Sequence, residues 1–183
     1  MSRRLILPRS KSDKITAMQA EMYEIVPCPQ GRLAIMPRPR EGLWLKSELV
    51  SLKVRGVTDL VSMLTPQEDI EVGLQAEAQY CAELGLRFHR HPVPDRRVPQ
   101  QPAFNEFITS LLPVLTQGGF IAIHCRAGIG RSTIVAAALL CRLGLSASDA
   151  VALITEARGF EVPDTDDQLE FIYSLDPGNS ASS

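Results

Sequence analysis

One short segment of the chain combines residue types that can bind and attack a phosphate. Residues 120–132 read FIAIHCRAGIGRS, so an apolar stretch is followed by Cys125, two glycines and Arg131. Gly128 and Gly130 tolerate positive φ, which lets the backbone curl with successive N–H groups pointing inward as an anion-binding nest. The residues whose backbone is predicted to hold the phosphate are Arg126, Ala127, Gly128, Ile129, Gly130 and Arg131.

Cys125 is the predicted nucleophile of this segment. The helix expected over residues 131–143 adds its positive N-terminal end, and cysteines at helix N-termini can have pKa values lowered to roughly 3.5–7.5. The thiolate attacks phosphorus, and the planar fork of Arg131 can bind two phosphate oxygens. Ser132 can donate its hydroxyl to the sulfur, and His124 is predicted to hold loop carbonyls in place rather than act as a base. The alternative is a buried cysteine in an ordinary strand-to-helix turn.

The segment from His124 to Ser132 resembles the His-Cys-x5-Arg-Ser/Thr signature of the protein tyrosine and dual-specificity phosphatases. The resemblance extends over residues 23–173 and is greatest to small bacterial or archaeal members of the dual-specificity type. It implies a phosphocysteine intermediate, with no metal and no cofactor. Thr133 stands where many members carry glycine, and we expect little effect because its side chain would lie within the first helical turn.

The resemblance also implies a general acid about thirty residues before the cysteine. Asp95 stands at that spacing, 125 − 95 = 30, in a proline-rich stretch after an expected strand. Asp95 and Cys125 would then both lie beyond the carboxyl ends of strands, where open α/β sheets bind ligands. A carboxylic acid there can protonate the departing oxygen. Without the resemblance, a surface aspartate in a proline-rich loop is an equal alternative.

Three further side chains are weaker candidates for the same site. Gln168 lies in a stretch that resembles the family's region after the signature, which implies that it orients the attacking water. The alternative is a solvated residue in the first turn of the last helix. Glu68 and Glu71 resemble an acidic loop of such phosphatases, and one of them can orient Arg131 or Arg97 through a salt bridge. A solvated charged loop is an equal alternative.

The elements that must position these residues alternate between strand and helix. This alternation implies a single-domain α/β fold with a mainly parallel central sheet of about four to five strands and helices on both faces. The phosphate loop lies between a strand and a helix of this fold. The expected strands are 23–26, 33–36, 57–64, 86–93 and 120–124; the expected helices are 47–55, 74–84, 103–116, 131–143, 146–159 and 166–175.

Particular residues mark where several helices should begin. Ser47 is a predicted cap, and Ser146 with Asp149 matches a capping box. Asp164 and Asp166 are interpreted as caps of the last helix.

Length, charge and cysteine content indicate how the chain is organised and which classes of partner are excluded. The 183 residues carry a net charge of −2, which argues against bulk nucleic-acid binding, and no apolar run is long enough to cross a membrane. Four cysteines without zinc-type spacing favour a reducing, cytoplasmic setting. We expect a flexible arm over residues 1–20, a phosphatase domain over 21–176 and a disordered tail over 177–183, in a monomeric protein.

The resemblance implies a phosphorylated protein as substrate, with phosphotyrosine preferred and phosphoserine or phosphothreonine admitted by a shallow pocket. The loop carries Arg126 and Ile129 where phosphoinositide-directed relatives often have lysines. Arg96 and Arg97 can attract acidic phosphopeptides or can be solvated. The alternatives are an RNA, nucleotide or lipid phosphatase, a catalytically weak phosphoprotein-binding module, and an oxyanion reductase or sulfur transferase.

Overall fold

A single twisted sheet forms the centre of the protein in a computed structural model that describes residues 19–176. Within these residues the sheet has five strands in the order β1-β2-β5-β3-β4. β1 pairs with β2 in antiparallel fashion, and all other neighbours are parallel. The strands are β1 (Tyr23–Ile25), β2 (Arg32–Met36), β3 (Asp59–Ser62), β4 (Arg87–Arg90) and β5 (Phe120–His124).

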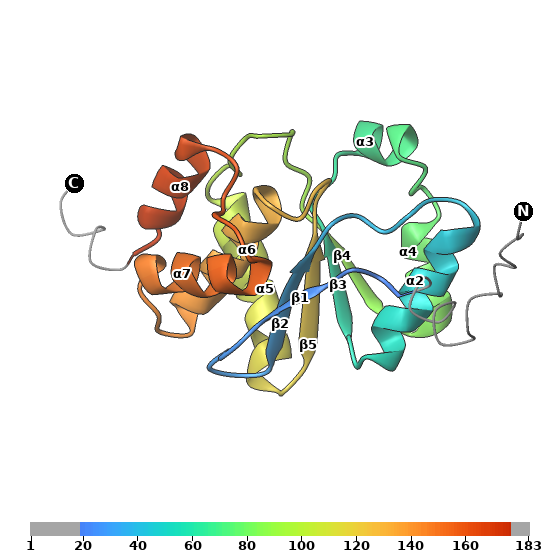
Figure 1. Ribbon diagram of the computed structural model, residues 1–183, viewed down its shortest axis with the longest axis horizontal. Helices are drawn as coiled ribbons and strands as arrows, with labels where there is room; N and C mark the ends of the chain where they lie inside the picture. Colours follow the sequence, from blue (N-terminus) through green and yellow to red (C-terminus); the bar gives the residue numbers. More distant parts are fainter. Residues whose placement is uncertain (1–18, 177–183) are drawn as a thin grey trace, which may run out of the picture.

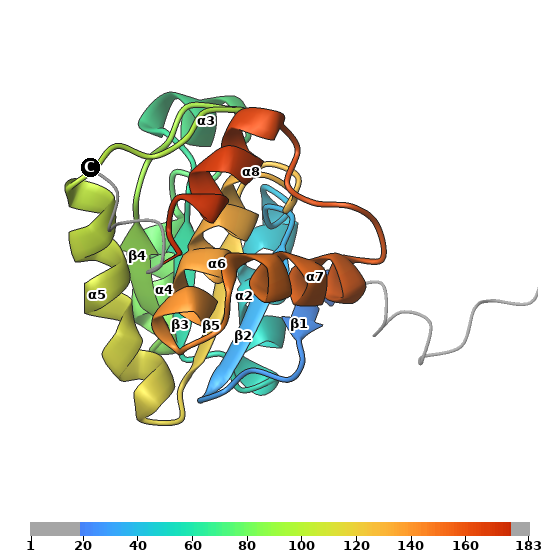
Figure 2. The ribbon, with the colours of Figure 1, turned by 90° about the vertical axis from the view of Figure 1, so that its left-hand side faces the viewer.

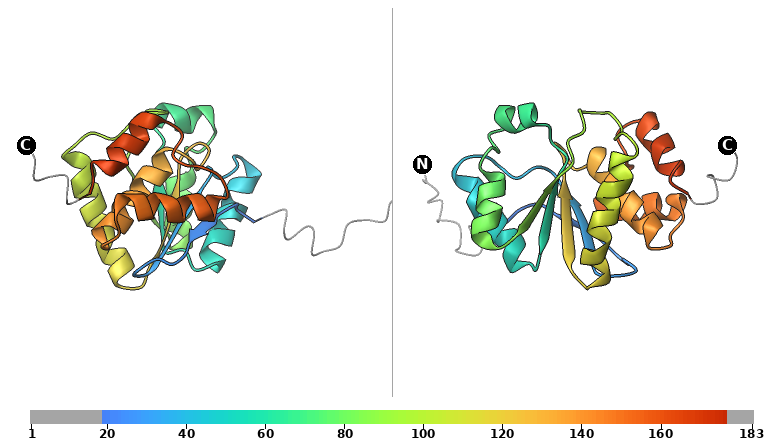
Figure 3. Two further views of the ribbon diagram at one scale, coloured as in Figure 1. Left: turned by 60° about the vertical axis from the view of Figure 1, so that its left-hand side comes forward. Right: turned by 180° about the vertical axis from the view of Figure 1, so that it is seen from behind.

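Helices cover both faces of the sheet (Figure 1). α2 and α4 pack on one face, whereas α5, α6, α7 and α8 form the layer on the other (Figures 2 and 3). The helices are α2 (Leu43–Val54), α3 (Pro66–Glu71), α4 (Glu77–Leu84), α5 (Ala103–Thr116), α6 (Arg131–Arg142), α7 (Ala147–Arg158) and α8 (Asp166–Tyr173). The predicted α/β fold is confirmed.

β5 lies between two hydrophobic cores because its side chains alternate between the faces of the sheet. Ile121 and Ile123 point into the core under α5 and α6. Phe120 and Ala122 point into the core under α2 and α4. A strand buried on both faces reads as a continuous apolar run, which is why this strand could be recognised from the sequence. The chain leaves β5 at His124 and enters the predicted phosphate loop.

α6 follows this loop as a buried central helix. Every residue from Arg131 to Cys141 is buried, so the helix is packed on all sides rather than along one stripe. A buried strand before the loop and a buried helix after it fix both of its ends.

Three predictions about helix starts need correction. α2 begins at Leu43 rather than near Ser47, after Gly42 with φ of 64°, a conformation that glycine adopts without a steric penalty. The cap of α8 is Thr165, whose hydroxyl accepts a hydrogen bond from the Gln168 N–H; Asp164 and Asp166 are not caps.

The acidic stretch at residues 66–71 forms the helix α3, which the sequence did not lead us to expect. Thr65 and Glu68 cap it reciprocally, since each side chain accepts from the backbone N–H of the other. The strands expected over 57–64 and 86–93 are shorter than predicted, because β3 and β4 have four residues each.

The ends of the chain lie mostly outside the described residues, which begin at 19 and end at 176. The expected arm and tail fall on residues 1–20 and 177–183, and only Gln19 and Ala20 of these are described. Ala20 is buried in the core beside α2. No helix in the described part of the chain has the length and apolar character needed to cross a membrane.

We predict that Ser146→Ala lowers the free energy of unfolding by about 1 kcal/mol. The Ser146 hydroxyl accepts from the Asp149 N–H at 3.1 Å at the start of α7, and alanine leaves that donor without its cap. Urea denaturation measures the change. Ser146→Asn, which can still cap, should stay within a few tenths of a kcal/mol of the wild type. Equal losses in both variants would contradict a capping role.

Candidate active site

Two glycines allow the loop between β5 and α6 to curl tightly against its neighbours. Gly128 has φ of +69°, and a Cβ there would lie 2.4 Å from the carbonyl carbon of Met36. A Cβ on Gly130 would lie 2.5 Å from the side-chain oxygen of Gln168. Any larger residue would push the loop off β2 or displace Gln168. The expectation of positive φ is confirmed for Gly128 but is wrong for Gly130, whose φ is −91° and where the close approach of Gln168 requires glycine.

The sulfur of Cys125 lies at the base of this loop, and the residue is only 3% exposed. Its Sγ is 3.5 Å from the hydroxyl of Ser132 at the start of α6. Burial by itself would raise the pKa of the thiol. Hydrogen bonds from the Ser132 side chain and backbone, the charge of Arg131 and the N–H of Ile129 outweigh burial, so the pKa of Cys125 is lowered. The environment thus favours the thiolate.

Arg131 lies beside the sulfur with its guanidinium almost fully buried. Glu68 binds both of its terminal nitrogens, at 2.8 and 2.9 Å. Nη1 also donates to the carbonyl of Val93 at 2.7 Å, and Nη2 donates to Asp95 at 3.0 Å. These contacts hold the plane of the guanidinium in one orientation.

Glu68 is the acidic residue that orients Arg131. The sequence had left open whether Glu68 or Glu71 has this role, or whether both lie in a solvated loop. Thr65 donates its backbone N–H to Glu68 at 3.0 Å. Burial raises the pKa of Glu68, but its hydrogen bonds to Arg131 and Thr65 lower this pKa by more than burial raises it. The carboxylate is therefore ionised. Glu71 instead pairs with Arg126, at 2.9 Å. The capping box of α3 therefore serves a second purpose, because it aims a carboxylate at the site.

Asp95 lies at the mouth of a small cavity above the sulfur. It follows β4, and its side chain is 57% exposed although one oxygen contacts Arg131. The cavity has a volume of about 150 Å³ and is lined by Asp95, Cys125, Arg131 and Gln168 among others. These four residues, which the sequence predicted for the site, thus line one cavity in the structure.

Gln168 is buried in the first turn of α8 and is only 1% exposed. Its amide nitrogen donates to the carbonyl of Arg97 at 3.3 Å. Its oxygen lies against Gly130 and lacks a hydrogen-bond partner among the described residues. The alternative of a solvated glutamine is wrong, because the side chain is buried at the wall of the small cavity.

His124 lies directly beneath the loop and faces a carboxylate that the sequence did not single out. Its Nε2 is 3.1 Å from Glu77 on α4, and both side chains are fully buried. Burial disfavours the imidazolium, but the charge of Glu77 and contacts with Cys125 outweigh it and raise the pKa of His124.

Arg158, at the end of α7, is another residue that sequence reasoning missed. It donates to the carbonyls of Gly128 and Ala127 at 3.1 and 3.3 Å. Its guanidinium lies 4.0 Å from the ring centroid of Tyr23 and 4.5 Å from that of Phe160. Arg158 thus holds the outer side of the loop, and an arginine at a helix end gives no sequence signal of such a contact.

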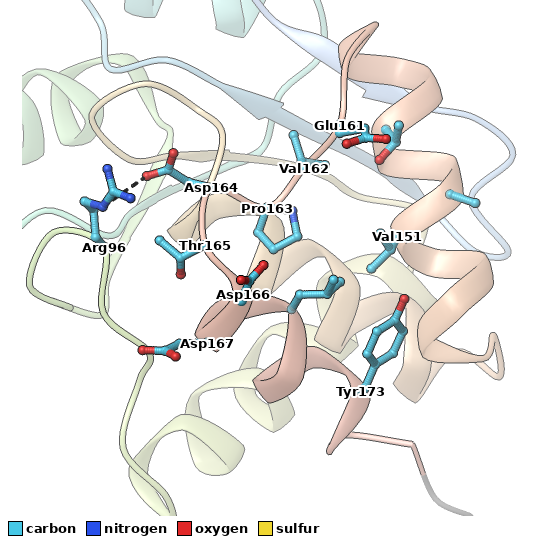
Figure 4. Close-up of a pocket in the computed structure, with 13 residues that line it drawn as sticks. Arg96, Val151, Glu161, Val162, Pro163, Asp164, Thr165, Asp166, Asp167 and Tyr173 are labelled. Carbon is cyan, nitrogen blue, oxygen red and sulfur yellow. Dashed lines mark ion pairs between the residues drawn. The ribbon is translucent and has the colours of Figure 1, made fainter.

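A larger cavity of about 720 Å³ adjoins the site between α7 and α8 (Figure 4). It shares Arg96 and Asp164 with the small cavity, and these two side chains lie 3.8 Å apart. Its remaining acidic residues are Glu161, Asp166 and Asp167. With four carboxylates against one arginine, this side of the mouth presents negative charge.

Comparisons with known proteins agree with this geometry. Residues 35–145 match the family model described as "Polymorphic toxin system, DSP-PTPase phosphatase". Cyclin-dependent kinase inhibitor 3 of Rattus norvegicus is 27% identical over 133 residues, which cover 72% of this chain and 63% of that protein. The chain therefore matches less than two thirds of the length of this curated relative.

Solved structures share the fold. A kinase-associated phosphatase, crystallised with its catalytic-site cysteine replaced by serine, has a TM-score of 0.78 and 22% identity, covering 90% of this chain and 98% of that one. Tk-PTP in its active form has a TM-score of 0.67 and 25% identity, covering 82% of this chain and 97% of that one.

We predict that Ser132→Ala raises the pH at which Cys125 becomes reactive, because the substitution removes the hydroxyl that stabilises the thiolate. The rate of iodoacetamide alkylation against pH, followed at Cys125 by mass spectrometry, gives the midpoint. Ser132→Thr keeps the hydroxyl and should stay near the wild-type midpoint. A midpoint that is the same in all three proteins would show that the hydroxyl does not stabilise the thiolate.

Proposed function

The chain belongs to the family of DSP-PTPase phosphatases described for polymorphic toxin systems, and on this premise we propose that it hydrolyses phosphomonoesters through a phosphocysteine intermediate. The observation that carries the proposal is the buried Cys125 thiol, whose thiolate form is favoured beside the oriented guanidinium of Arg131. No metal or cofactor takes part in the proposed reaction.

In the first step, the Cys125 thiolate attacks the phosphorus in line with the bond to the leaving alcohol. A sulfur–phosphorus bond forms as the phosphorus–oxygen bond breaks, and Asp95 donates a proton to the departing oxygen. The phosphoryl oxygens receive hydrogen bonds from the loop N–H groups of residues 126–131 and from Arg131. Asp95 lies 3.0 Å from Arg131, which supports its position beside a bound phosphoryl group.

In the second step, water attacks the phosphocysteine and the sulfur leaves as the thiolate. Asp95, now ionised, accepts the proton of the water, and inorganic phosphate is released. Gln168, which lines the cavity, orients this water with its side-chain amide. Ser132 stabilises the leaving sulfur from 3.5 Å, and His124, buried directly before Cys125, supports the loop from below.

The proposed substrate is a phosphorylated protein. A cavity of about 150 Å³ is far smaller than an ordinary ligand pocket, so it holds the phosphoryl group and leaves most of the alcohol at the mouth. Such a site takes phosphotyrosine and also admits phosphoserine and phosphothreonine. The names of two similar proteins, a kinase inhibitor and a kinase-associated phosphatase, support a protein partner. A monomer in the cytoplasm remains our prediction from composition.

The purified protein should hydrolyse p-nitrophenyl phosphate in the presence of chelator and reductant. Cys125→Ser should reduce the rate to background, because the hydroxyl at this position is not ionised at neutral pH. Retained activity in this variant would exclude a phosphocysteine route. A folded wild type without activity on this ester, phosphopeptides, RNA ends or phosphoinositides would instead indicate a phosphate-binding module.

Asp95→Asn should lower kcat for an alkyl phosphate by about 10²–10⁴, the usual contribution of general acid catalysis. The loss should be smaller for p-nitrophenyl phosphate in the first step, because nitrophenolate leaves without a proton. Steady-state and burst kinetics separate the two steps. Asp166→Asn, a change of an exposed acid on α8, is the matched control and should be near wild type. Equal losses for both leaving groups in burst kinetics would refute the role of Asp95 as the acid.

A further inference from the structure

A carboxylate is buried beneath the predicted phosphate loop without any direct access to the cavity. Glu77 is the first residue of α4, it is 0% exposed, and its Oε1 lies 3.1 Å from Nε2 of the equally buried His124. Removing two ionisable groups from water is costly, and a buried ion pair often adds little to stability compared with apolar residues of similar volume. A pair in this place beneath the nucleophile is therefore a candidate for a role in reactivity rather than in stability.

Other ionisable groups lie near the pair of Glu77 and His124. Asp69 on α3 is 3% exposed and pairs with Arg90 on β4 at 2.5 Å. Cys81, on the same helix as Glu77, stays neutral because burial raises its pKa to about 12. Asp69 therefore has a cation of its own, and His124 is the basic side chain that faces Glu77.

The imidazolium lies next to the sulfur both in sequence and in space. His124 immediately precedes Cys125, and interaction with the Cys125 sulfur is one of the causes that raise the pKa of His124. The interaction is mutual, so a protonated His124 favours the ionised sulfur by the same free energy. Glu77 does not line the cavity, and its contact on the side of Cys125 is the one with His124.

We propose that Glu77 is a positioning residue, whose carboxylate keeps His124 protonated and thereby keeps Cys125 ionised at acidic pH. This rests on the proposed function only for its effect on catalysis; the ionisation of the sulfur can be measured without any phosphatase assay.

Glu77→Gln tests the proposal, because glutamine keeps the size of the side chain and removes its charge. We expect the midpoint of Cys125 alkylation to move up by about one pH unit, so that the alkylation rate well below the midpoint falls about tenfold. The rate at pH well above the midpoint should be unchanged. The acid limb of kcat/KM for p-nitrophenyl phosphate should move by the same amount. Glu83→Gln, on the exposed side of α4, is the matched control and should leave both profiles in place.

A double-mutant cycle with His124→Gln identifies the route of the effect. If Glu77 acts through His124, Glu77→Gln should cause no further shift in the His124→Gln background. A full additional shift, or an unchanged alkylation midpoint in the single variant, would overturn the proposal. A shifted alkylation profile in a protein that hydrolyses no phosphate ester would sustain the role of Glu77 and refute the proposed function.

An NMR measurement on the wild type covers the case in which Glu77→Gln fails to fold. The imidazole ¹⁵N shifts of His124 report its protonation directly. We expect an imidazolium at pH 7, a pH at which a histidine with the ordinary pKa of about 6.5 is mostly neutral. A neutral ring at pH 7 would overturn the proposal irrespective of the variants.

Discussion

A guanidinium with only 2% of its surface exposed has to be fully paired, and much of this architecture serves to pair Arg131. Its charge is matched by Glu68 from α3, and two further acceptors, Val93 and Asp95, come from the chain after β4. α3 follows β3, and β3 and β4 both lie on one side of β5 in the sheet. The parallel sheet therefore delivers two separate stretches of sequence to one arginine, at the edge where the loop of Cys125 begins.

The two layers of helices hold the loop from opposite sides. Glu68 and Glu77 reach it from the side of α3 and α4, whereas Arg158 and Gln168 reach it from α7 and α8 (Figures 1 and 2). Glu68 pairs with Arg131 and Glu77 with His124, while Arg158 binds two carbonyls of the loop. The anion-binding shape is therefore not a property of the loop alone, since it depends on contacts with elements distant in sequence.

Sequence reasoning succeeded where the determinants are local. The strand 120–124 and the helix 103–116 were predicted to the residue, because an apolar run and flanking glycines mark their ends. Cys125 could be singled out because it shares one short segment with its glycines and Arg131. Glu77 was missed because one acid in a polar, amphipathic segment looks the same whether it faces water or a buried histidine. Thr165 was overlooked as a cap because neighbouring aspartates are equally good caps in isolation.

The arginines at the mouth of the site are paired with neighbouring acids. Arg96, which could have drawn acidic peptides toward the site, is paired with Asp164, and Arg126 is paired with Glu71. The net charge of −2 adds no long-range attraction for an anionic substrate. Recognition of the phosphoryl group therefore depends on short-range hydrogen bonds from the loop and Arg131, and the carboxylates between α7 and α8 disfavour substrates with acidic residues on that side. Under the proposed function, we therefore expect selectivity to arise at the rim of the site and the reactivity of Cys125 to depend on the buried pairs beneath it.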